Sequence, residues 1–537
     1  MHKIKPEMRV VFILILLLFA VFLFLPLIIL LIRSFETDQG ISLANYIAVW
    51  KEPDMLAAAW NSVKVSAAAA IIATVSGFIL AYSIHCTRIY SPIKGALRTA
   101  IILPMLLPTI TYGFAIMYSF GNQGLLTKLF GRNLFEIYGF NGLLTGYVIY
   151  TLPSAFLLIH NAFGYIDKKI IIVSRLMGDG AVRSFANTIV RPLVGALGGA
   201  FVLSFILSFT DFGIPASVGG TYPVVATRLY QVMLGAIPNF NQGAVIAVLM
   251  LIPAVFGIWL LNYLERLNFH YDKISDIELP RHRTRDIALG VISCAIVLGL
   301  LSIFAIMFIA PFLNSFPYDL HFTFKHVRDV LTSDLTGVYK NSLGVALLTS
   351  LFGTVMAYGA ALLNVRTKLK GREASDIVSM ITNTVPGMVL GISYLLLFNG
   401  SSLKGTFTII VLCNIVHLFT TPYLMAKNSL SKMNPSWETT GELLGDSWFK
   451  TVRRIVLPNS VSTVLEMFSY YFVNSMVTIS GIIFLVSAQT SVMASKIKEL
   501  QHFAKFNEIF VLSLLIFLTN LVIKILCDWM QRRRAVS

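Results

Sequence analysis

The sequence predicts an all-α integral membrane protein with about twelve transmembrane helices in two tandem six-helix repeats. Its 537 residues are 56% hydrophobic and 13% charged, and the mean hydropathy is +0.77. Soluble domains carry about 25% charged residues, so most of this chain is expected to face lipid or protein interior. Apolar runs of membrane-spanning length recur along the chain. Residues that mark the first half of the chain also return in the second.

Twelve apolar segments are expected to cross the bilayer. The first continues from Val10 to Ile32 without interruption, which is too long for the core of a signal peptide, so a retained span is expected. Gly, Pro and polar residues interrupt several others, and membrane helices tolerate such residues when their neighbours satisfy the backbone. The expected spans are 10–33, 61–85, 99–120, 142–164, 193–213, 242–264, 286–313, 341–364, 376–398, 405–426, 459–485 and 508–530.

Lysine and arginine collect in alternate connections between these spans. The basic segments are 86–98, 165–191, 265–285, 365–375, 427–458 and 532–534. Cytoplasmic loops of membrane proteins are rich in these residues, so the alternation predicts a multi-pass protein of the cell membrane with both termini in the cytoplasm. The loop 486–507 departs from the pattern with Lys496, Lys498 and Lys505. The net charge of +16 is thus attributed to loops, and because the charges form no stripe, nucleic acid is not expected as a partner.

Sequence motifs of catalysis and of cofactor binding are missing. The dipeptide Gly-Lys does not occur, which excludes a P-loop for ATP. Neither His-Glu-x-x-His nor Gly-x-Ser-x-Gly is present. The four cysteines form no Cys-x-x-Cys pair and lie in or beside apolar runs, so buried free thiols without a metal are expected. The chain is therefore predicted to be no enzyme and to hold no cofactor or metal of its own.

An internal duplication is predicted from residues that recur in order. The matched residues are Asn61-Ser62 with Asn341-Ser342, Pro108 and Gly113 with Pro386 and Gly391, and Pro192 with Pro458. Their offsets fall between 266 and 280 residues. The predicted division is a first unit 1–264, a cytoplasmic linker 265–285 and a second unit 286–537. Six spans per half preserve orientation, so the halves are expected to be related by an axis along the membrane normal, with a pathway between them.

The loop after the fourth span of each half has the pattern of a short helix, a glycine break and a proline that opens the next span. In the second half, Asn434 is expected to cap a helix that starts at Pro435 and breaks at Gly445. In the first half, Asp167 is expected to cap the helix and Gly178 to break it. Both patterns indicate a docking element rather than a simple connector.

These loops resemble the cytoplasmic EAA loop of binding-protein-dependent ABC importer permeases, which forms a coupling helix seated in a groove of the ATPase. The second loop keeps the family's Gly and Leu-Pro, although Thr439-Thr440-Gly441 stand where Glu-Ala-Ala is common. The first loop departs further, with Arg191 in place of the Leu before Pro. The resemblance implies that the residues coupling the chain to the ATPase are Glu438, Gly445, Leu457, Pro458, Ser174, Gly178 and Pro192.

The resemblance also implies partners. It predicts that the chain pairs with two copies of a separate ATPase, which carries ATP and Mg, and with an extracytoplasmic solute-binding protein. Short segments around Asp211 and around Asn474 are similar to the fused permeases of ferric-iron and 2-aminoethylphosphonate importers, and closer to the phosphonate type. The expected function is import of a small solute across the cytoplasmic membrane, and the expected substrate is 2-aminoethylphosphonate or ferric iron.

Polar residues within or beside the spans are candidates for the substrate path, because their burial in lipid is costly. They are Asp211, Thr210, Asn474, Ser475, Thr478, Asn383 and Thr384. Asp211 has a second interpretation, exposure at the outer mouth of a span. Alternative functions are an ABC permease for thiamine or polyamine and, from another class, an ion-coupled secondary transporter with parallel repeats. The second alternative normally needs charged residues at mid-span, and this chain has few.

Overall fold

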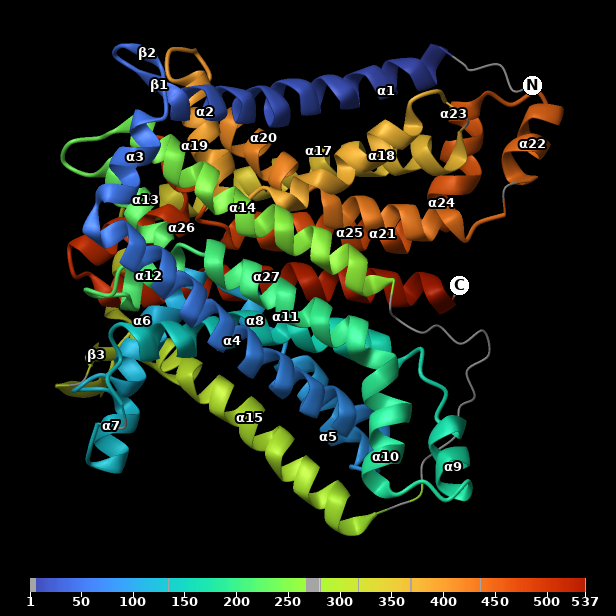
Figure 1. Ribbon diagram of the computed structural model, residues 1–537, viewed down its shortest axis with the longest axis horizontal. Coiled ribbons are helices and arrows are strands. Elements are labelled where there is room, and N and C mark those ends of the chain that lie inside the picture. Colours follow the sequence, from blue (N-terminus) through green and yellow to red (C-terminus); the bar gives the residue numbers. More distant parts are fainter. Residues whose placement is uncertain are drawn as a thin grey trace. The chain divides into compact units, whose positions relative to one another are not determined.

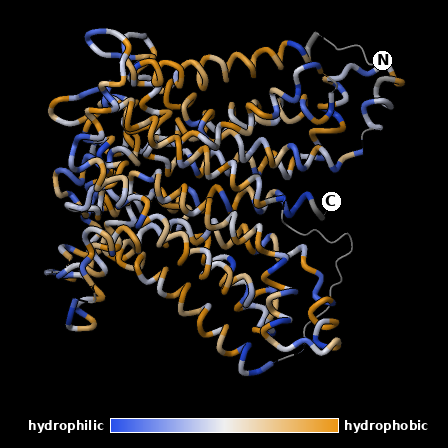
Figure 2. The backbone as a smooth tube through the Cα atoms, viewed as in Figure 1, coloured by the Kyte–Doolittle hydropathy of each residue, from blue (hydrophilic) through white to orange (hydrophobic). Residues whose placement is uncertain are grey.

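The computed structural model describes residues 6–133, 135–266, 280, 282–316, 318–367, 369–434 and 436–536. Among these residues almost all regular structure is helical, and strands form only two short antiparallel hairpins. One hairpin pairs β1 (Glu36–Thr37) with β2 (Gly40–Ile41), and the other pairs β3 (Leu313–Ser315) with β4 (Asp319–Phe322). Apolar residues run along the long helices (Figures 1 and 2). The predicted all-α membrane class is confirmed.

Eight helical segments are long and apolar enough to cross a membrane, and two bent helix pairs raise the number to ten among the described residues. The eight are Met8–Phe35, Pro53–Cys86, Phe140–Phe163, Ala181–Thr210, Phe240–Leu261, Arg283–Phe312, Leu335–Arg366 and Phe506–Arg534. The bent pairs are Ser91–Leu106 with Thr109–Phe130, at 107°, and Phe407–His417 with Thr420–Ser431, at 52°. Proline explains the first bend, since Pro108 lies in the break, at the N-cap of α6, and lacks the N–H that a continuous helix needs.

Two of the predicted spans are shorter than expected. The segment 376–398 is divided, because a 3₁₀ turn at Thr382–Thr384 separates α18 (Arg372–Ile381) from α19 (Gly387–Phe398). The segment 459–485 contains α25 (Val461–Val477), which has 17 residues and ends where Thr478 takes an extended conformation. The predicted count of twelve spans is therefore not confirmed.

The described chain folds into two compact units. The first combines the chain up to Val49 with Val232–Leu251 and the chain from Val327 onward. Its helices are α1 (Pro6–Phe19), α2 (Leu25–Phe35), α3 (Ala44–Lys51), the first part of α14 (Phe240–Glu265), α16 (Lys325–Thr332), α17 (Leu335–Arg366), α18, α19, α20 (Phe407–His417), α21 (Thr420–Ser431), α22 (Ser436–Leu443), α23 (Trp448–Thr451), α24 (Leu457–Asn459), α25, α26 (Met493–His502) and α27 (Phe506–Val536).

The second unit combines Trp50–Gln231 with the described residues of 252–326. Its helices are α4 (Pro53–Cys86), α5 (Ser91–Ala100), α6 (Thr109–Phe120), α7 (Leu125–Phe130), α8 (Phe140–Phe163), α9 (Lys169–Leu176), α10 (Ala181–Phe185), α11 (Val194–Thr210), α12 (Gly213–Val218), α13 (Val225–Leu234), the second part of α14, and α15 (Arg283–Ile309).

Helix α17 lies at the centre of the first unit, against α21 and α25. Glycine allows one close approach, because a Cβ at Gly353 would come within 2.8 Å of the Tyr471 ring. The N-terminal helices pack in this unit too: α1 contacts α17, α2 contacts α19, and the Tyr394 hydroxyl donates to the carbonyl of Phe22 at 2.6 Å. The first span of the chain thus packs against helices from the second half of the sequence.

Helices α4, α8 and α11 form the core of the second unit. The helix α15 packs against α4 and α6, and two hydrogen bonds fix it. The Ser119 hydroxyl donates to the carbonyl of Ile303 at 3.1 Å, and the hydroxyls of Ser293 and Ser83 are 2.8 Å apart. This unit therefore contains the first helix of the second half. These two units are defined by which helices pack together. The predicted ranges 1–264 and 286–537 were defined by the sequence repeat instead, and they stay a prediction.

The two Asn-Ser pairs that marked the repeat make the same contacts in the two units. In the second unit, Asn61 donates to the carbonyl of Pro223 at 3.1 Å, and the Ser62 hydroxyl accepts from the N–H of Val225 at 2.9 Å. In the first unit, Asn341 donates to the carbonyl of Ser491 at 3.1 Å and Ser342 accepts from the N–H of Met493 at 2.7 Å. Each pair therefore anchors the start of a helix, α13 or α26.

Candidate functional site

The second loop, residues 432–458, forms the expected helix and break. The Asn434 side chain accepts from the N–H of Ser436 at 2.9 Å, so the predicted cap of α22 is confirmed. Pro435 lies outside the described residues. Gly445 has a φ of +76°, a left-handed conformation that glycine adopts without steric cost. The N–H of Asp446 donates back to the carbonyl of Gly441 at 2.9 Å and closes the turn. The glycine break is thus a tight reversal between α22 and α23.

The first loop, residues 165–192, has the same backbone geometry. Asp167 accepts from the N–H of Lys169 at 3.0 Å and caps α9. Gly178 has a φ of +88°, and the N–H of Asp179 donates to the carbonyl of Ser174 at 3.1 Å. Each of these positions lies 267 residues before its counterpart in the second loop. The two loops are therefore copies of one turn.

An ion pair follows the turn in both copies. Asp179 lies 3.2 Å from Arg183, and Asp446 pairs with Lys450. Each pair joins a residue to the one four positions later, across the first turn of α10 or α23, which is the spacing at which helical side chains meet. These pairs are partly solvated and contribute little stability by themselves. Their value is orientation, because they fix the second helix against the turn.

A π-helical turn enters the next span in both loops. Ala186–Val190 precedes Pro192, and Val452–Val456 precedes Pro458. Proline cannot donate to the helical ladder and its ring crowds the preceding turn, so a wider turn is an expected local response. Pro192 is buried and Leu457 is partly exposed. The two prolines thus lie where each loop continues into a membrane helix.

Glu438 is held by a basic residue of α17. The Arg366 guanidinium binds both carboxylate oxygens of Glu438, at 2.6 Å and 2.5 Å, and donates to the carbonyls of Met433 and Asn434 at 2.8 Å. The side chains are only 4% and 16% exposed. A bidentate pair of this kind fixes direction as well as distance. The acidic residue of α22 is therefore fastened to the end of a long membrane helix.

The first loop has a side-chain hydrogen bond within its turn. Ser174, at the position of Gly441, donates its hydroxyl to the carboxylate of Asp179 at 2.8 Å. Gly441 has no side chain, and a Cβ there would come within 2.4 Å of the Thr451 hydroxyl. The second loop is therefore tied to α17 through Arg366.

Two adjacent apolar side chains are exposed at the tip of each loop. They are Leu443 and Leu444, 84% and 77% exposed, and Leu176 and Met177, both 81% exposed. In each unit the helix that carries them lies beyond the ends of the long helices (Figure 1). Paired exposed hydrophobics at equivalent positions indicate an interaction surface. We call them the tip pairs.

The predicted substrate-path residues fall in both units. Thr210 and Asp211 end α11 in the second unit, where Thr210 donates to the carbonyl of Ile206 at 2.8 Å. Asp211 is 7% exposed, so exposure at an outer mouth does not describe it, and it accepts from the N–H of Ile214 at 2.8 Å. It therefore fixes the start of α12.

The other candidates lie in the first unit. Asn474 and Thr478 are joined, since Thr478 donates to the carbonyl of Asn474 at 2.7 Å. Ser475 is buried and accepts from Asn414 at 2.9 Å, which links α25 to α20. Asn383 and Thr384 belong to the 3₁₀ turn before α19, where Thr384 donates to the carbonyl of Ile381 at 2.7 Å. A role of these residues in substrate contact stays a prediction.

Sequence reasoning missed Arg366 and the tip pairs. Arg366 is 72 residues from Glu438, and no local pattern joins them. The tip pairs carry a signal that was available: both are apolar dipeptides directly before the turn glycine. Aligning the two loops at the offset of 267 would have found them.

Residues 349–536 match the family described as binding-protein-dependent transport system inner membrane component. The ferric transport system permease protein FbpB of Actinobacillus pleuropneumoniae is 25% identical over 536 residues, covering 96% of this chain and 77% of that protein. An FbpB protein of Haemophilus influenzae, FbpB 1, is 26% identical over 454 residues, covering 80% of this chain and 70% of its own length. The spermidine/putrescine transport system permease protein PotC of the same organism is 24% identical and aligns 94% of its length with 46% of this chain.

The chain is similar to the fused permeases of ABC importers, and its second half matches the binding-protein-dependent permease family. Its resemblance to the fused permeases is confirmed by the two FbpB proteins, which align along most of it. Because these relatives are transport permeases, the chain is a transport subunit and not an enzyme. It is a multi-pass protein of the cytoplasmic membrane, and permeases of this type work with an ATPase and a solute-binding protein. The orientation of the termini stays a prediction.

Proposed function

We propose that this permease imports a small solute received from an extracytoplasmic binding protein, and that two copies of a separate ATPase drive it through the two loops. The ATPase copies carry the ATP and Mg, and the permease binds neither. The observation that carries the proposal is the repeated loop: cap, glycine turn, ion pair and exposed tip pair recur at one offset. A surface built twice in the same form fits two copies of one partner.

The geometry supports transmission of force through these loops. Each tip pair would be buried in a groove of the ATPase, and the rigid turn behind it would pass the motion to α11 or α25. In the second loop the Arg366–Glu438 pair offers a further route to α17. Alternating access would follow as the ATPase closes on ATP and the two states of the permease change population.

The coupling surface is tested by the double variant Leu443→Ser/Leu444→Ser in the full transporter. Because both side chains are already exposed, the permease should fold, while ATPase co-purification in mild detergent and solute uptake should fall by about tenfold or more. The matched control is Leu129→Ser/Phe130→Ser in α7, where the side chains are 75% and 59% exposed outside the two loops. Full ATPase recovery with the first variant would refute the proposed docking.

For the solute we propose ferric iron, because the two relatives that align along most of the chain are named ferric transport permeases. The resemblance of short segments around Asp211 and Asn474 favours 2-aminoethylphosphonate as the competitor. Reconstituted permease, ATPase and binding protein should take up labelled iron in an ATP-dependent way. Uptake of 2-aminoethylphosphonate, thiamine or a polyamine in place of iron would overturn this choice and leave the importer mechanism standing.

A further inference from the structure

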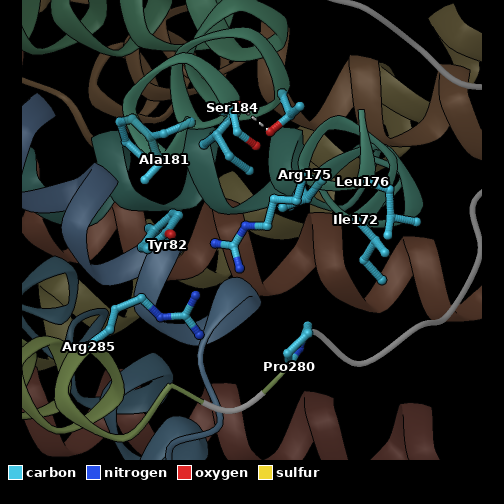
Figure 3. Close-up of a pocket in the computed structure, with 12 residues that line it drawn as sticks. Tyr82, Ile172, Arg175, Leu176, Ala181, Ser184, Pro280 and Arg285 are labelled. Carbon is cyan, nitrogen blue, oxygen red and sulfur yellow. Dashed lines mark hydrogen bonds between the residues drawn. The ribbon is translucent and has the colours of Figure 1, made fainter. Parts of the chain in front are cut away.

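A cavity of about 260 Å³ lies beside the first loop, within the second unit. It is bounded by the end of α4, by α9 and α10, by the π-helical turn 186–190 and by the start of α15 (Figure 3). The elements come together because α15 packs along α4 while the loop folds back toward the same end. The cavity is therefore part of the packed unit and adjoins a coupling loop.

Two arginines face this cavity. The guanidinium of Arg175, from the last turn of α9, and that of Arg285, from α15, point toward one another, and the Tyr82 ring lies beside them (Figure 3). Two like charges directed into one hollow repel, and the repulsion is stronger in a partly apolar site than in water. An anion bound between the two guanidinium groups would attract both, and this attraction would outweigh their repulsion.

One of the two charges is already balanced. Arg285 donates to the carboxylate of Asp286 at 2.8 Å, and Asp286 is buried. Among the described residues no carboxylate pairs with Arg175. The cavity thus contains two guanidinium groups and has one carboxylate beside it. One positive charge, that of Arg175, remains without a carboxylate partner among the described residues.

Much of the remaining lining is apolar. Ile171, Ile172, Phe185 and Ile189 line the cavity, together with Ser184 and Thr188. Basic pockets between membrane helices, near the cytoplasmic end that the charge pattern predicts here, have the composition that receives phosphate groups of lipids. Arginine is favoured for such a ligand because its planar fork donates two parallel hydrogen bonds to phosphate oxygens.

We propose that this cavity binds a phosphoryl anion held between Arg175 and Arg285, with the Tyr82 hydroxyl as a third donor. The anion is the headgroup of an acidic phospholipid or free phosphate, since both present the same oxygens. Bound there, it links α9 of the first loop to α15. This link gives the first loop a connection to a long helix, as the Arg366–Glu438 pair does for the second.

The site is tested on the full chain, purified in detergent and delipidated, with two probes: inorganic phosphate and dioleoyl phosphatidylglycerol. Thermal unfolding is followed by tryptophan fluorescence, and lipid retention by native mass spectrometry. The variant is Arg175→Gln, whose side chain is exposed and whose loss leaves the Arg285–Asp286 pair intact. The control is Arg191→Gln, which removes the same charge from the same loop outside the cavity.

Wild type and Arg191→Gln should gain unfolding temperature with a probe, and Arg175→Gln should need about tenfold more of it, because a charge-assisted contact is lost. Arg175→Lys should recover part of the response, because it restores charge without the fork. Saturation by phosphate alone identifies a free anion, whereas a response to phosphatidylglycerol but not to phosphate or phosphatidylcholine identifies a lipid. No response to either probe, or an equal loss in Arg175→Gln and Arg191→Gln, would overturn the proposal.

Discussion

Arg366 is nearly inaccessible to solvent and has four hydrogen-bond acceptors within the second loop: two carboxylate oxygens of Glu438 and the carbonyls of Met433 and Asn434. Loss of its counter-ion would destabilise the folded loop strongly, because a buried charge without a partner keeps its full desolvation penalty. The pair therefore makes the second loop dependent on one side-chain contact.

Removing Glu438 should loosen the second loop. We expect Glu438→Ala to destabilise the loop by about 3–5 kcal/mol, because Arg366 stays buried without its partner. Glu438→Gln, which keeps one hydrogen bond, should cost less. Hydrogen exchange over residues 434–446 and ATPase co-purification measure the effect. Glu499→Ala is the control, since Glu499 forms only an exposed pair with Lys496. Equal exchange in both alanine variants would contradict the prediction.

Ser174 should matter less than Glu438. Its hydroxyl makes one partly buried hydrogen bond to Asp179, and the loss of such a bond costs about 0.5–1.5 kcal/mol. Ser174→Ala should therefore reduce ATP-driven uptake less than Glu438→Ala at equal abundance in the membrane. Uptake assays on the two variants, normalised to immunoblots, decide the ranking. A reversed order would show that the first loop bears more of the coupling.

At the scale of the element, substitutions of the two turn glycines are predicted to have equal effects on stability. Gly445 and Gly178 have φ values of +76° and +88°, with open space around each. Gly445→Ala and Gly178→Ala should each cost about 1–2 kcal/mol, because a Cβ disfavours the left-handed conformation. Thermal unfolding and coupling are measured against Gly400→Ala, which also has open space but no positive φ. If the two loop variants differed clearly in unfolding temperature, the cost would not come from the left-handed backbone conformation that the two glycines share.

The Asn-Ser pairs give a second prediction about elements. Ser342→Ala should free the start of α26, because the buried N–H of Met493 loses its acceptor at a cost of about 1–3 kcal/mol. Ser62→Ala should do the same to α13. Hydrogen exchange should rise in 493–502 for the first variant and in 225–234 for the second. Ser401→Ala, at an exposed turn, serves as control. Faster exchange in neither helix would contradict the assigned anchor role.

At the scale of the whole molecule, the sequence predicted what depends on local chemistry. Apolar length located the long helices, and the caps Asn434 and Asp167, the glycine turns and the two prolines are short-range signals. The broken helices were harder, because polar residues are scattered along the segment 459–485 and do not reveal that α25 ends at Val477. Contacts such as Arg366 with Glu438 depend on tertiary packing and could not be predicted from either segment alone.

The packing of the first span with the second half has a consequence for assembly. The first half of the sequence contributes α1, α2, α3 and part of α14 to the unit built mainly by the second half, and the second half contributes α15 to the other unit. This is the reciprocal exchange seen in domain-swapped dimers, here within one polypeptide. Cleavage of the chain between residues 265 and 285 would leave two fragments, and each fragment would lack helices that its own unit needs for packing. They would be obligate partners, and the covalent linker would serve to fix their one-to-one ratio.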